Sequence, residues 1–370
     1  MVNLKNFNWI TGLFIISYHL LLLSLLPVYI LRENPSIALI MTAVVVGAIT
    51  SLGMTAGYHR YFAHRSYVLY KVGEKIILFL GALSVQGSAL RWVYDHRIHH
   101  RYVDTEKDPY SIKKGFWYAH MGWLFKKNKC INPIVVPDLI KNKAVMFQHK
   151  YYGWLVLATN LAVVIVGDIF FKDLLGAFVL LFLARLFCTH HTTWFINSWA
   201  HTMGDKPYSQ EHSAVNNAAL AFFTFGEGYH NYHHTFPSDY RNGVSWYQYD
   251  PTKIVIWCLA KIGMVKNLRK VELPLIKRKM ILEDQRVMLE IIKKMSQQKW
   301  KDVEEQIKKV ADSLNAKLLE RYTLMMKCRV QKKEERRKLK LKIKALKRNI
   351  QEEYKVWITV CNKIITKKIA

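Results

Sequence analysis

Four long apolar segments occupy the first part of the chain and constrain its fold more than any other feature. They are Trp9 to Leu31, Ser36 to about Thr55, Trp154 to Phe171 and Leu174 to about Ile196. A helix of about 20 apolar residues crosses a bilayer, and four such segments with so few charges are unusual in a soluble core. Because the break within each pair is short, the sequence predicts an all-α integral membrane protein with four transmembrane helices in two hairpins.

A fifth segment, Val72 to Leu90, contains Glu74, Lys75 and Gln86, so we expect it to lie at the membrane interface or against the soluble face. Four crossings then leave every histidine-rich stretch on one side of the membrane. The loops on that side are rich in Lys and Arg, whereas the hairpin turns hold little positive charge. Since positively charged loops face the cytoplasm, we expect a cytoplasmic helical cap that carries these histidines.

Positive charge is concentrated near the C-terminus. The whole chain has a formal charge of +28, and the residues from Lys261 onward, with 32 basic and 13 acidic side chains, account for +19 of it. Apolar residues recur among these charges, which predicts long amphipathic helices. We therefore divide the chain into a membrane domain, residues 1–265, and a basic helical extension, residues 266–370. The extension is expected to meet anionic lipid or an acidic electron donor, and not nucleic acid.

Histidines gather in short motifs. Nine of them occur in HRYFAH (His59, His64), HRIHH (His96, His99, His100), HNYHH (His230, His233, His234) and NSWAH (His201, four residues after Asn197). Positions i, i+3 and i+4 of an α-helix share one face, so each HxxHH motif is expected to present three imidazoles toward one point. The five-residue spacing in HRYFAH does not match one α-helical face, so we expect this motif to straddle a helix end.

These histidines predict a site for two metal ions, because nine imidazoles exceed what one ion accepts. Unpaired buried imidazoles would be costly, whereas metal coordination satisfies them. Imidazole nitrogen suits iron, zinc, copper and nickel. A structural zinc site takes only about four ligands and often uses thiolates, but the five cysteines are scattered without a Cys-x-x-Cys pair. Redox-active iron is therefore favoured over zinc, and structural disulfides are not expected.

The chain resembles the membrane fatty acyl desaturases, most closely the acyl-CoA delta-9 type, from about Trp9 to Met264. The shared blocks are GMTAGYHRYFAHRSY, WVYDHRIHHRYVDTEKDPYS, GFWYAHMGWL, NSWAHTMGDKPY and GEGYHNYHHTFPSDYRNG. The resemblance implies an O2-dependent enzyme with two iron ions that introduces a cis double bond into a saturated long-chain acyl-CoA. It implies a first iron held by His59, His64, His96, His100 and His233, and a second held by His99, His201, His230 and His234, with Asn197 reaching it through water.

Further candidate residues surround this set. The resemblance places Lys126 and Lys127 at the CoA headgroup, and we assign Trp92 and Asp95 to substrate binding, with Trp123 and Trp194 as further candidates to line the acyl tunnel. Carboxylates near the ligands are candidates to orient imidazoles by hydrogen bonding. They are Asp95, Asp104, Glu106, Asp108, Glu227 and Asp239.

Electrons are expected from a separate protein, either cytochrome b5-like or ferredoxin-like, because the sequence contains neither a haem-binding module nor a Cys-rich ferredoxin segment. On the same ground a bacterial inner membrane is favoured over the endoplasmic reticulum. Three alternatives stay open: a desaturase acting on acyl chains of intact phospholipids, a related membrane di-iron hydroxylase, and a metal-binding membrane receptor or scaffold without oxygen chemistry.

Overall fold

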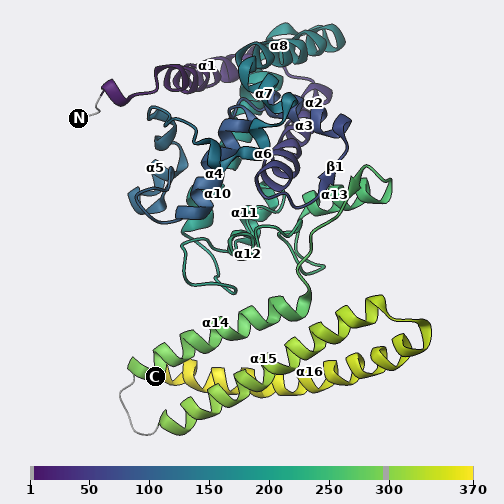
Figure 1. The fold of residues 1–370 in the computed structure, drawn as a ribbon. Helices are drawn as coiled ribbons and strands as arrows, with labels where there is room; N and C mark the ends of the chain where they lie inside the picture. The colour runs from purple at the N-terminus through teal and green to yellow at the C-terminus, as the bar shows by residue number, and fades with distance from the viewer. Residues whose placement is uncertain (1–3, 295–299, 370) are drawn as a thin grey trace. The chain divides into compact units, whose positions relative to one another are not determined.

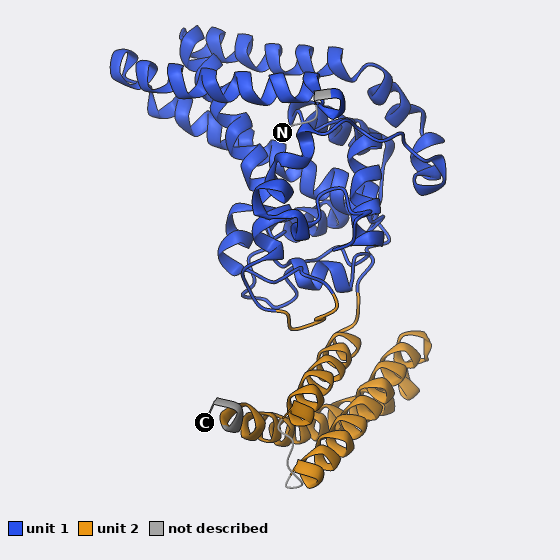
Figure 2. Ribbon diagram, turned by 90° about the vertical axis from the view of Figure 1, so that its left-hand side faces the viewer, with its two compact units in different colours: residues 1–205, 212–270 blue, residues 206–211, 271–370 orange. Residues whose placement is uncertain are grey.

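The computed structural model describes residues 4–294 and 300–369, and almost all of its regular structure is helical. The chain divides into two compact units, coloured blue and orange in Figure 2. The first unit comprises residues 1–205 and 212–270, and the second comprises residues 206–211 and 271–370. The helical class expected from the sequence is confirmed. The described residues add one antiparallel pair of two-residue strands, β1 (Val68–Leu69) and β2 (Val265–Lys266).

Four helical stretches of the first unit are long and apolar enough to cross a membrane, as the sequence predicts. Two of them contain π-helical segments, in which each backbone N–H bonds to the carbonyl five residues earlier. In chain order the stretches are α1 (Trp9–Glu33); α2 (Ile37–Leu52) with the π-helical η2 (Gly53–Ala63); α8 (Tyr152–Phe171); and α9 (Leu174–Gly176) with the π-helical η6 (Ala177–Ala184), α10 (Arg185–Ser198) and the 3-10 turn η7 (Trp199–His201).

Short polar links connect these stretches in pairs. Asn34 ends α1 with a left-handed backbone, and the Ser36 hydroxyl caps α2 by accepting a hydrogen bond from the Leu39 N–H at 3.2 Å. Asp173 caps α9 in the same way. Large apolar side chains cover the outer surfaces of the stretches, with Ile10 exposed at 87%. Such an apolar surface is suited to lipid and not to water.

The other helices of the first unit are shorter (Figure 1). The first of them covers most of the fifth apolar segment, has 13 residues and is not among the candidate spans of the described residues. In chain order they are α3 (Lys71–Leu83), α4 (Ala89–Tyr102), α5 (Phe116–His120), α6 (Pro137–Ile140), α7 (Lys143–Lys150), α11 (Ala218–Phe223), α12 (His230–Thr235) and α13 (Pro251–Lys261), with 3-10 turns at Leu4–Asn6, Ile112–Lys114, Gly122–Phe125 and Pro133–Val135.

An apolar core fixes η2 and α4, which carry many of the histidines. Tyr58 of η2, Val93 of α4 and Val145 of α7 are completely buried in it. Gly81 of α3 allows the close approach of η2, because a Cβ atom there would lie only 2.1 Å from the Tyr58 ring. The histidine-bearing segments are therefore held by close packing.

The second unit contains three long helices around a core of its own. They are α14 (Leu273–Lys294), α15 (Lys301–Val330) and α16 (Lys333–Ile369), so the long helices expected in the extension are present, while residues 295–299 and 370 lie outside the described part. Ile307, Leu314 and Ile364 are completely buried, and Trp357 is 2% exposed. The boundary expected at residue 265 falls within β2, which pairs with β1 of the first unit.

Candidate metal centre

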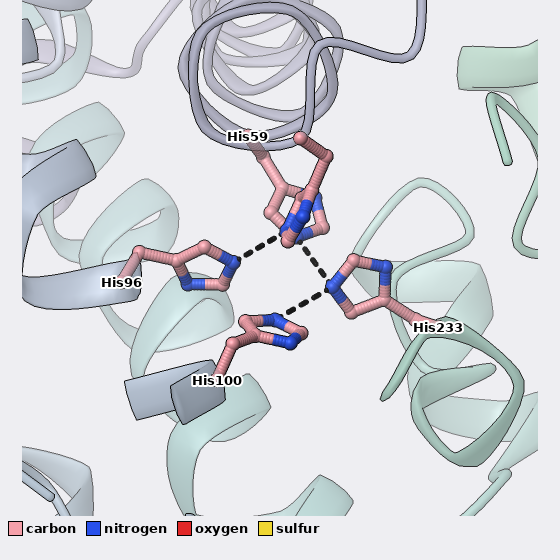
Figure 3. A group of neighbouring side chains, drawn as sticks. His59, His96, His100 and His233 are labelled. Atoms are coloured by element: carbon pink, nitrogen blue, oxygen red, sulfur yellow. Dashed lines mark hydrogen bonds between the residues drawn. The ribbon is translucent and has the colours of Figure 1, made fainter. Parts of the chain in front are cut away.

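Five histidines from three separate segments converge on one point of the first unit. Their ligand nitrogens all lie within 4.8 Å of one another. The Nε2 atom of His233 lies 3.0 Å from that of His59 and 3.0 Å from that of His100, and the Nε2 atoms of His64 and His96 are 2.8 Å apart. Figure 3 shows the rings of His59, His96, His100 and His233 pointing toward one another. We call these five residues the first histidine group.

The π-helical form of η2 explains how His59 and His64 share this group. The His64 N–H bonds to the His59 carbonyl at 3.1 Å, an i→i+5 link that places the two residues about one turn apart. Their ring centroids are 4.8 Å apart. The expectation that HRYFAH lies at a helix end is confirmed, since His64 caps η2. Reasoning from the α-helical period alone missed the reason for the five-residue spacing.

Four more histidines form a second group beside the first. The Nε2 atom of His234 lies 3.3 Å from that of His99 and 3.1 Å from that of His230, and the ring of His201 is 4.9 Å from the ring of His230. The ligand nitrogens of these four residues again lie within 4.8 Å of one another. The rings of His100 and His234, one from each group, are 4.2 Å apart. We call this set the second histidine group.

Each HxxHH motif is divided between the two groups, so the expectation that three imidazoles of one motif meet at a single point is wrong. On α4, His96 and His100 enter the first group and His99 enters the second. On α12, His233 enters the first group and its two companions enter the second. Positions i and i+4 lie almost above one another, whereas i+3 lies to one side, so one helix serves two neighbouring points.

Carboxylates beside two of these rings favour a cation at each point. The Asp108 carboxylate lies 2.9 Å from His99 Nδ1, and the Glu227 carboxylate lies 2.9 Å from His59 Nδ1. A carboxylate requires a proton on the nitrogen it faces, which leaves Nε2 of a neutral ring with a lone pair. The His59 lone pair then points into its group, toward the His233 Nε2 atom. Lone pairs directed into a shared point repel one another unless a cation lies between them.

The spacing of the nitrogens also fits metal coordination. For a metal–nitrogen bond of about 2.1 Å, two ligands at a right angle are about 3.0 Å apart, which matches the shortest separations in both groups. Burial, followed by the neighbouring imidazoles, holds the pKa of six of these histidines well below the usual value. Those rings are therefore neutral, which is the form that binds metal. The six are His64, His96, His100, His230, His233 and His234.

Buried and half-buried polar residues around the groups hold the imidazoles in orientation. Asp104 accepts a hydrogen bond from the Ser213 hydroxyl at 2.5 Å, and the Ser213 Oγ lies 2.7 Å from His201 Nδ1. The Tyr110 hydroxyl lies 3.2 Å from His96 Nδ1. Sequence reasoning missed Tyr110, although it follows Asp108 by two residues. It also missed Ser213, for which no sequence motif gave a signal.

Glu227 is itself held by Arg60, which is 1% exposed. The Arg60 guanidinium donates two hydrogen bonds to Glu227, at 2.9 and 3.1 Å, and two to Asp250, at 3.0 and 3.1 Å. Burial raises the pKa of Glu227, but His59 and Arg60 outweigh it, so the pKa lies below its usual value. Glu227 is therefore a fixed anion beside the first histidine group.

Three of the other candidate carboxylates have partners away from the imidazoles. Asp95 pairs with Arg91 at 2.6 Å, Glu106 pairs with Lys114 at 3.3 Å, and Asp239 accepts a hydrogen bond from Tyr232 at 2.7 Å. Of the six carboxylates singled out from the sequence, the structure brings Asp108 and Glu227 directly to imidazoles and Asp104 to one through Ser213.

A cavity of about 420 Å³ leads to both histidine groups. Its walls are mainly apolar and come largely from α1, α4 and α10, and His59, His96, His99 and His230 stand along it. Trp92 and Asp95, which the sequence analysis assigned to substrate binding, border the cavity, and so does Asn197. Trp123 and Trp194 border it as well. Lys126 and Lys127 do not border it in the described part of the chain, and the Lys126 Nζ atom lies 4.6 Å from the centre of the Tyr118 ring.

Known proteins resemble this chain over most of its first unit. A family model described as fatty acid desaturase matches residues 35–264. A probable acyl-CoA desaturase of Schizosaccharomyces pombe is 39% identical over 270 residues, which cover 71% of this chain and 55% of that protein. Acyl-CoA desaturase 1 of Saccharomyces cerevisiae is 38% identical over 259 residues, which cover 68% and 50%.

A bacterial protein matches over nearly its whole length. The sn-1 stearoyl-lipid 9-desaturase of Anabaena variabilis is 32% identical over 266 residues, which cover 71% of this chain and 94% of that protein. By contrast, the chain spans only about half the length of the two yeast relatives. The family model covers the segments that carry both histidine groups. The chain belongs to the fatty acid desaturase family.

Proposed function

We propose that this protein is an O2-dependent desaturase that introduces a cis double bond, at the delta-9 position, into a saturated long-chain acyl-CoA. The observation that carries the proposal is the pair of histidine groups at the side of an apolar cavity. Apolar walls suit a hydrocarbon chain and exclude water from it. The two yeast relatives are named acyl-CoA desaturases, which supports the same substrate class.

Two iron ions are the proposed cofactors. The first histidine group would hold one ion, and the second group would hold the other, with Asn197 reaching it through water. Nitrogen donors alone suit several metals, and membership of the desaturase family favours iron. Iron bound there would supply the oxidising power, with O2 and two electrons, that removes hydrogen from an unactivated methylene.

The protein's own residues position and protect the reactants. The cavity walls hold the acyl chain beside the histidine groups, so the reacting carbons need no free diffusion. Asp108, Glu227 and Ser213 keep the His99, His59 and His201 rings in fixed orientations. Trp92 stacks on His96 with ring centroids 5.0 Å apart, which places one apolar wall directly against a proposed ligand.

The proposed membrane arrangement has two helical hairpins and a cap of shorter helices on the cytoplasmic side. The short links at residues 34–36 and 172–173 support hairpins. His59 and His201 lie at the ends of the second and fourth candidate spans, and an even number of crossings puts both ends on one side. The excess of positive loops on that side supports a cytoplasmic location.

The sequence favoured a bacterial inner membrane, whereas the two yeast relatives favour the endoplasmic reticulum, the alternative given above. We propose the endoplasmic reticulum on that ground. Fractionating the membranes of the source cell tests the choice.

Lys126 and Lys127 are proposed to meet the CoA headgroup, and Trp92 and Asp95 to contact the substrate within the cavity. We further propose that residues 1–265 form the catalytic domain and residues 266–370 a basic extension that docks an acidic electron donor or anionic lipid. A cytochrome b5-like or ferredoxin-like protein is the proposed donor.

A second candidate is a desaturase that acts on acyl chains of intact phospholipids. The Anabaena relative supports it, because that protein is named a stearoyl-lipid 9-desaturase and is matched over 94% of its length. Stearoyl-CoA and a stearoyl phospholipid, supplied together with distinct isotopic labels, separate the two candidates, since only the true substrate acquires a double bond.

The proposal is tested with the full chain in membranes supplied with O2 and a reduced donor. We expect about two iron ions per chain, and an alkene as the product by gas chromatography with mass spectrometry. His99→Ala and His230→Ala should abolish the alkene, and His149→Ala, away from both groups, should not. An alcohol product would indicate a hydroxylase. Metal binding without donor-dependent O2 consumption would indicate a receptor or scaffold.

A further inference from the structure

Four histidines outside the first and second histidine groups surround Trp194 of α10. The ring centroids of His191, His190, His120 and His19 lie 5.0, 5.2, 5.8 and 6.4 Å from the Trp194 indole. These side chains come from α1, α5 and α10. Trp194 is 5% exposed and borders the cavity. Ionisable residues within or beside membrane spans are expensive to keep, which makes a functional role the first hypothesis.

Hydrogen bonds join three of these histidines into one continuous series, in which the donor and the acceptor of each bond are fixed. His19 Nδ1 lies 2.7 Å from the Ile15 carbonyl oxygen and must donate to it. In the neutral ring His19 Nε2 then accepts, and its partner is His191 Nε2 at 3.0 Å. His191 Nδ1 in turn accepts from His120 Nε2 at 3.0 Å. His120 Nδ1 faces the Ser198 hydroxyl at 3.0 Å, and that hydroxyl shares its proton with the Trp194 carbonyl oxygen at 3.1 Å. One tautomer of each ring satisfies every nitrogen.

The fourth histidine belongs to a second chain built in the same way. His190 Nε2 lies 2.9 Å from the Ser84 carbonyl oxygen and donates to it. His190 Nδ1 is therefore the acceptor, and the Tyr18 hydroxyl donates to it at 3.0 Å. Both chains start at a hydroxyl and end at a backbone carbonyl, so neither leaves an unpaired polar atom in an apolar region.

The pairing also separates this cluster from a metal site. In the two histidine groups, several ring nitrogens converge on a shared point. Around Trp194, by contrast, each ring nitrogen faces a single hydrogen-bond partner. All the lone pairs are used by N–H or O–H donors. The cluster is thus complete as a neutral hydrogen-bonded network.

The network fixes part of the wall of the cavity that both histidine groups border. It ties α1, whose Phe14 and Ile15 also border the cavity, to α10 and α5. Trp194 lies one helical turn before Asn197 on α10, and Asn197 borders the same cavity as His230 of the second histidine group. The indole is thus held by four fixed rings in the wall of the cavity that residues of both histidine groups also border.

We propose that His19, His120, His190 and His191 are positioning residues that fix Trp194 as a rigid wall of the cavity and so set which carbons of the acyl chain face the metal groups. This inference rests on the proposed desaturase function. The methylenes of a saturated chain are chemically alike, so only the shape of the cavity determines the site of reaction. Misplacement by about 1 Å is enough to change reactivity strongly.

The test uses the full chain with stearoyl-CoA, and its readout is the position of the double bond. His191→Phe keeps an aromatic ring but removes both hydrogen bonds, and His191→Gln keeps one donor and one acceptor. We expect one dominant isomer from the wild type, an approximately tenfold larger share of neighbouring isomers from His191→Phe, and a smaller increase from His191→Gln. Metal content should be unchanged in both.

Two further variants show whether the histidines act through the indole. Trp194→Phe should broaden the isomer distribution in the same direction, and adding His191→Phe to it should produce no further change. His19 is the last histidine of the hydrogen-bonded series, and its one side-chain partner there is His191. His19→Phe therefore replaces His191→Phe as the test variant if His191→Phe does not fold. His149→Phe is the matched control, because His149 bonds Ser88 at 2.7 Å and does not border the cavity.

An unchanged isomer distribution in folded His191→Phe and His19→Phe would overturn the inference, and so would a uniform loss of rate at every position. Equal broadening in His149→Phe would also count against it. If the wild type makes no alkene from stearoyl-CoA, the proposed function fails instead, so the two failures are distinguishable.

Discussion

Replacement of Asp108 by asparagine tests whether the carboxylates around the histidine groups control metal retention. Asp108 is 1% exposed. Its Oδ1 atom accepts hydrogen bonds from His99 Nδ1 at 2.9 Å and from the Tyr110 N–H at 3.2 Å, and its Oδ2 atom accepts one from the Asp104 N–H at 3.2 Å. An asparagine amide has one acceptor oxygen. Asp108→Asn must therefore lose either the hydrogen bonds from His99 and Tyr110 or the hydrogen bond from Asp104.

The size of the effect follows from the bond that is lost. A hydrogen bond to a charged group contributes about 1.5–3 kcal/mol, and loss of a partner behind a metal-bound histidine typically costs about 10–100-fold in metal affinity or activity. If the amide nitrogen faces His99, that ring must adopt the other tautomer, with its proton on Nε2. We therefore expect the second histidine group to lose metal about 10–100 times faster than in the wild type, while the first group keeps its metal.

The assay measures metal per chain by mass spectrometry after timed exposure of the purified full chain to a chelator. Glu106→Gln is the matched control, because it makes the same chemical change in the same segment and Glu106 pairs only at the surface, with Lys114. A biphasic loss in Asp108→Asn, with one fast phase, is the expected result. Loss at the wild-type rate from both groups would refute the role assigned to Asp108.

Three further predictions follow from the same structure. His100→Ala should empty the first histidine group and abolish desaturation, as metal and product analysis would show, whereas His149→Ala should do neither. Gly228→Ala should lower the yield of folded protein several-fold, because its Cβ would lie 2.2 Å from the Ala221 backbone nitrogen, whereas Gly153→Ala has open space and should be neutral; equal yields of the two variants would contradict this. Burial raises the pKa of Asp138, but hydrogen bonds from Arg97 and Arg65 outweigh burial and lower the pKa. The ionised carboxylate therefore stabilises the fold at a pH above the pKa of an unfolded Asp, about 3.9, and this stabilisation is lost as the pH falls. The difference in thermal unfolding between Asp138→Asn and the wild type should therefore shrink steadily as the pH falls from about 5 toward 2, and a difference that stays constant would contradict the assignment.

The membrane spans and the histidine set were predictable from sequence for clear physical reasons. A run of about 20 apolar residues has few folded solutions outside lipid, and clustered imidazoles have few stable arrangements without metal. The spacing of His59 and His64 was a different case. It is explained by π-helical bonding in η2, and a pattern analysis based on 3.6 residues per turn does not contain that geometry.

Contacts between distant parts of the chain were harder to predict. The role of Ser213 depends on its approach to His201 and Asp104, which no motif encodes. The contacts among the histidines around Trp194 could not be predicted, because their pairing appears only when α1, α5 and α10 are brought together. Asp95, by contrast, borders the cavity but pairs with Arg91, which its position directly before the HRIHH motif did not suggest.

The three helices that follow residue 270 fill their interior with their own side chains, Trp357 among them. A segment that completes its own burial needs no side chain from another part of the protein to fill its core. The family match ends at residue 264, just before this segment. Sequence drift among α14, α15 and α16 should accordingly alter how much of the protein a cell maintains, because none of the nine proposed metal ligands lies in these helices.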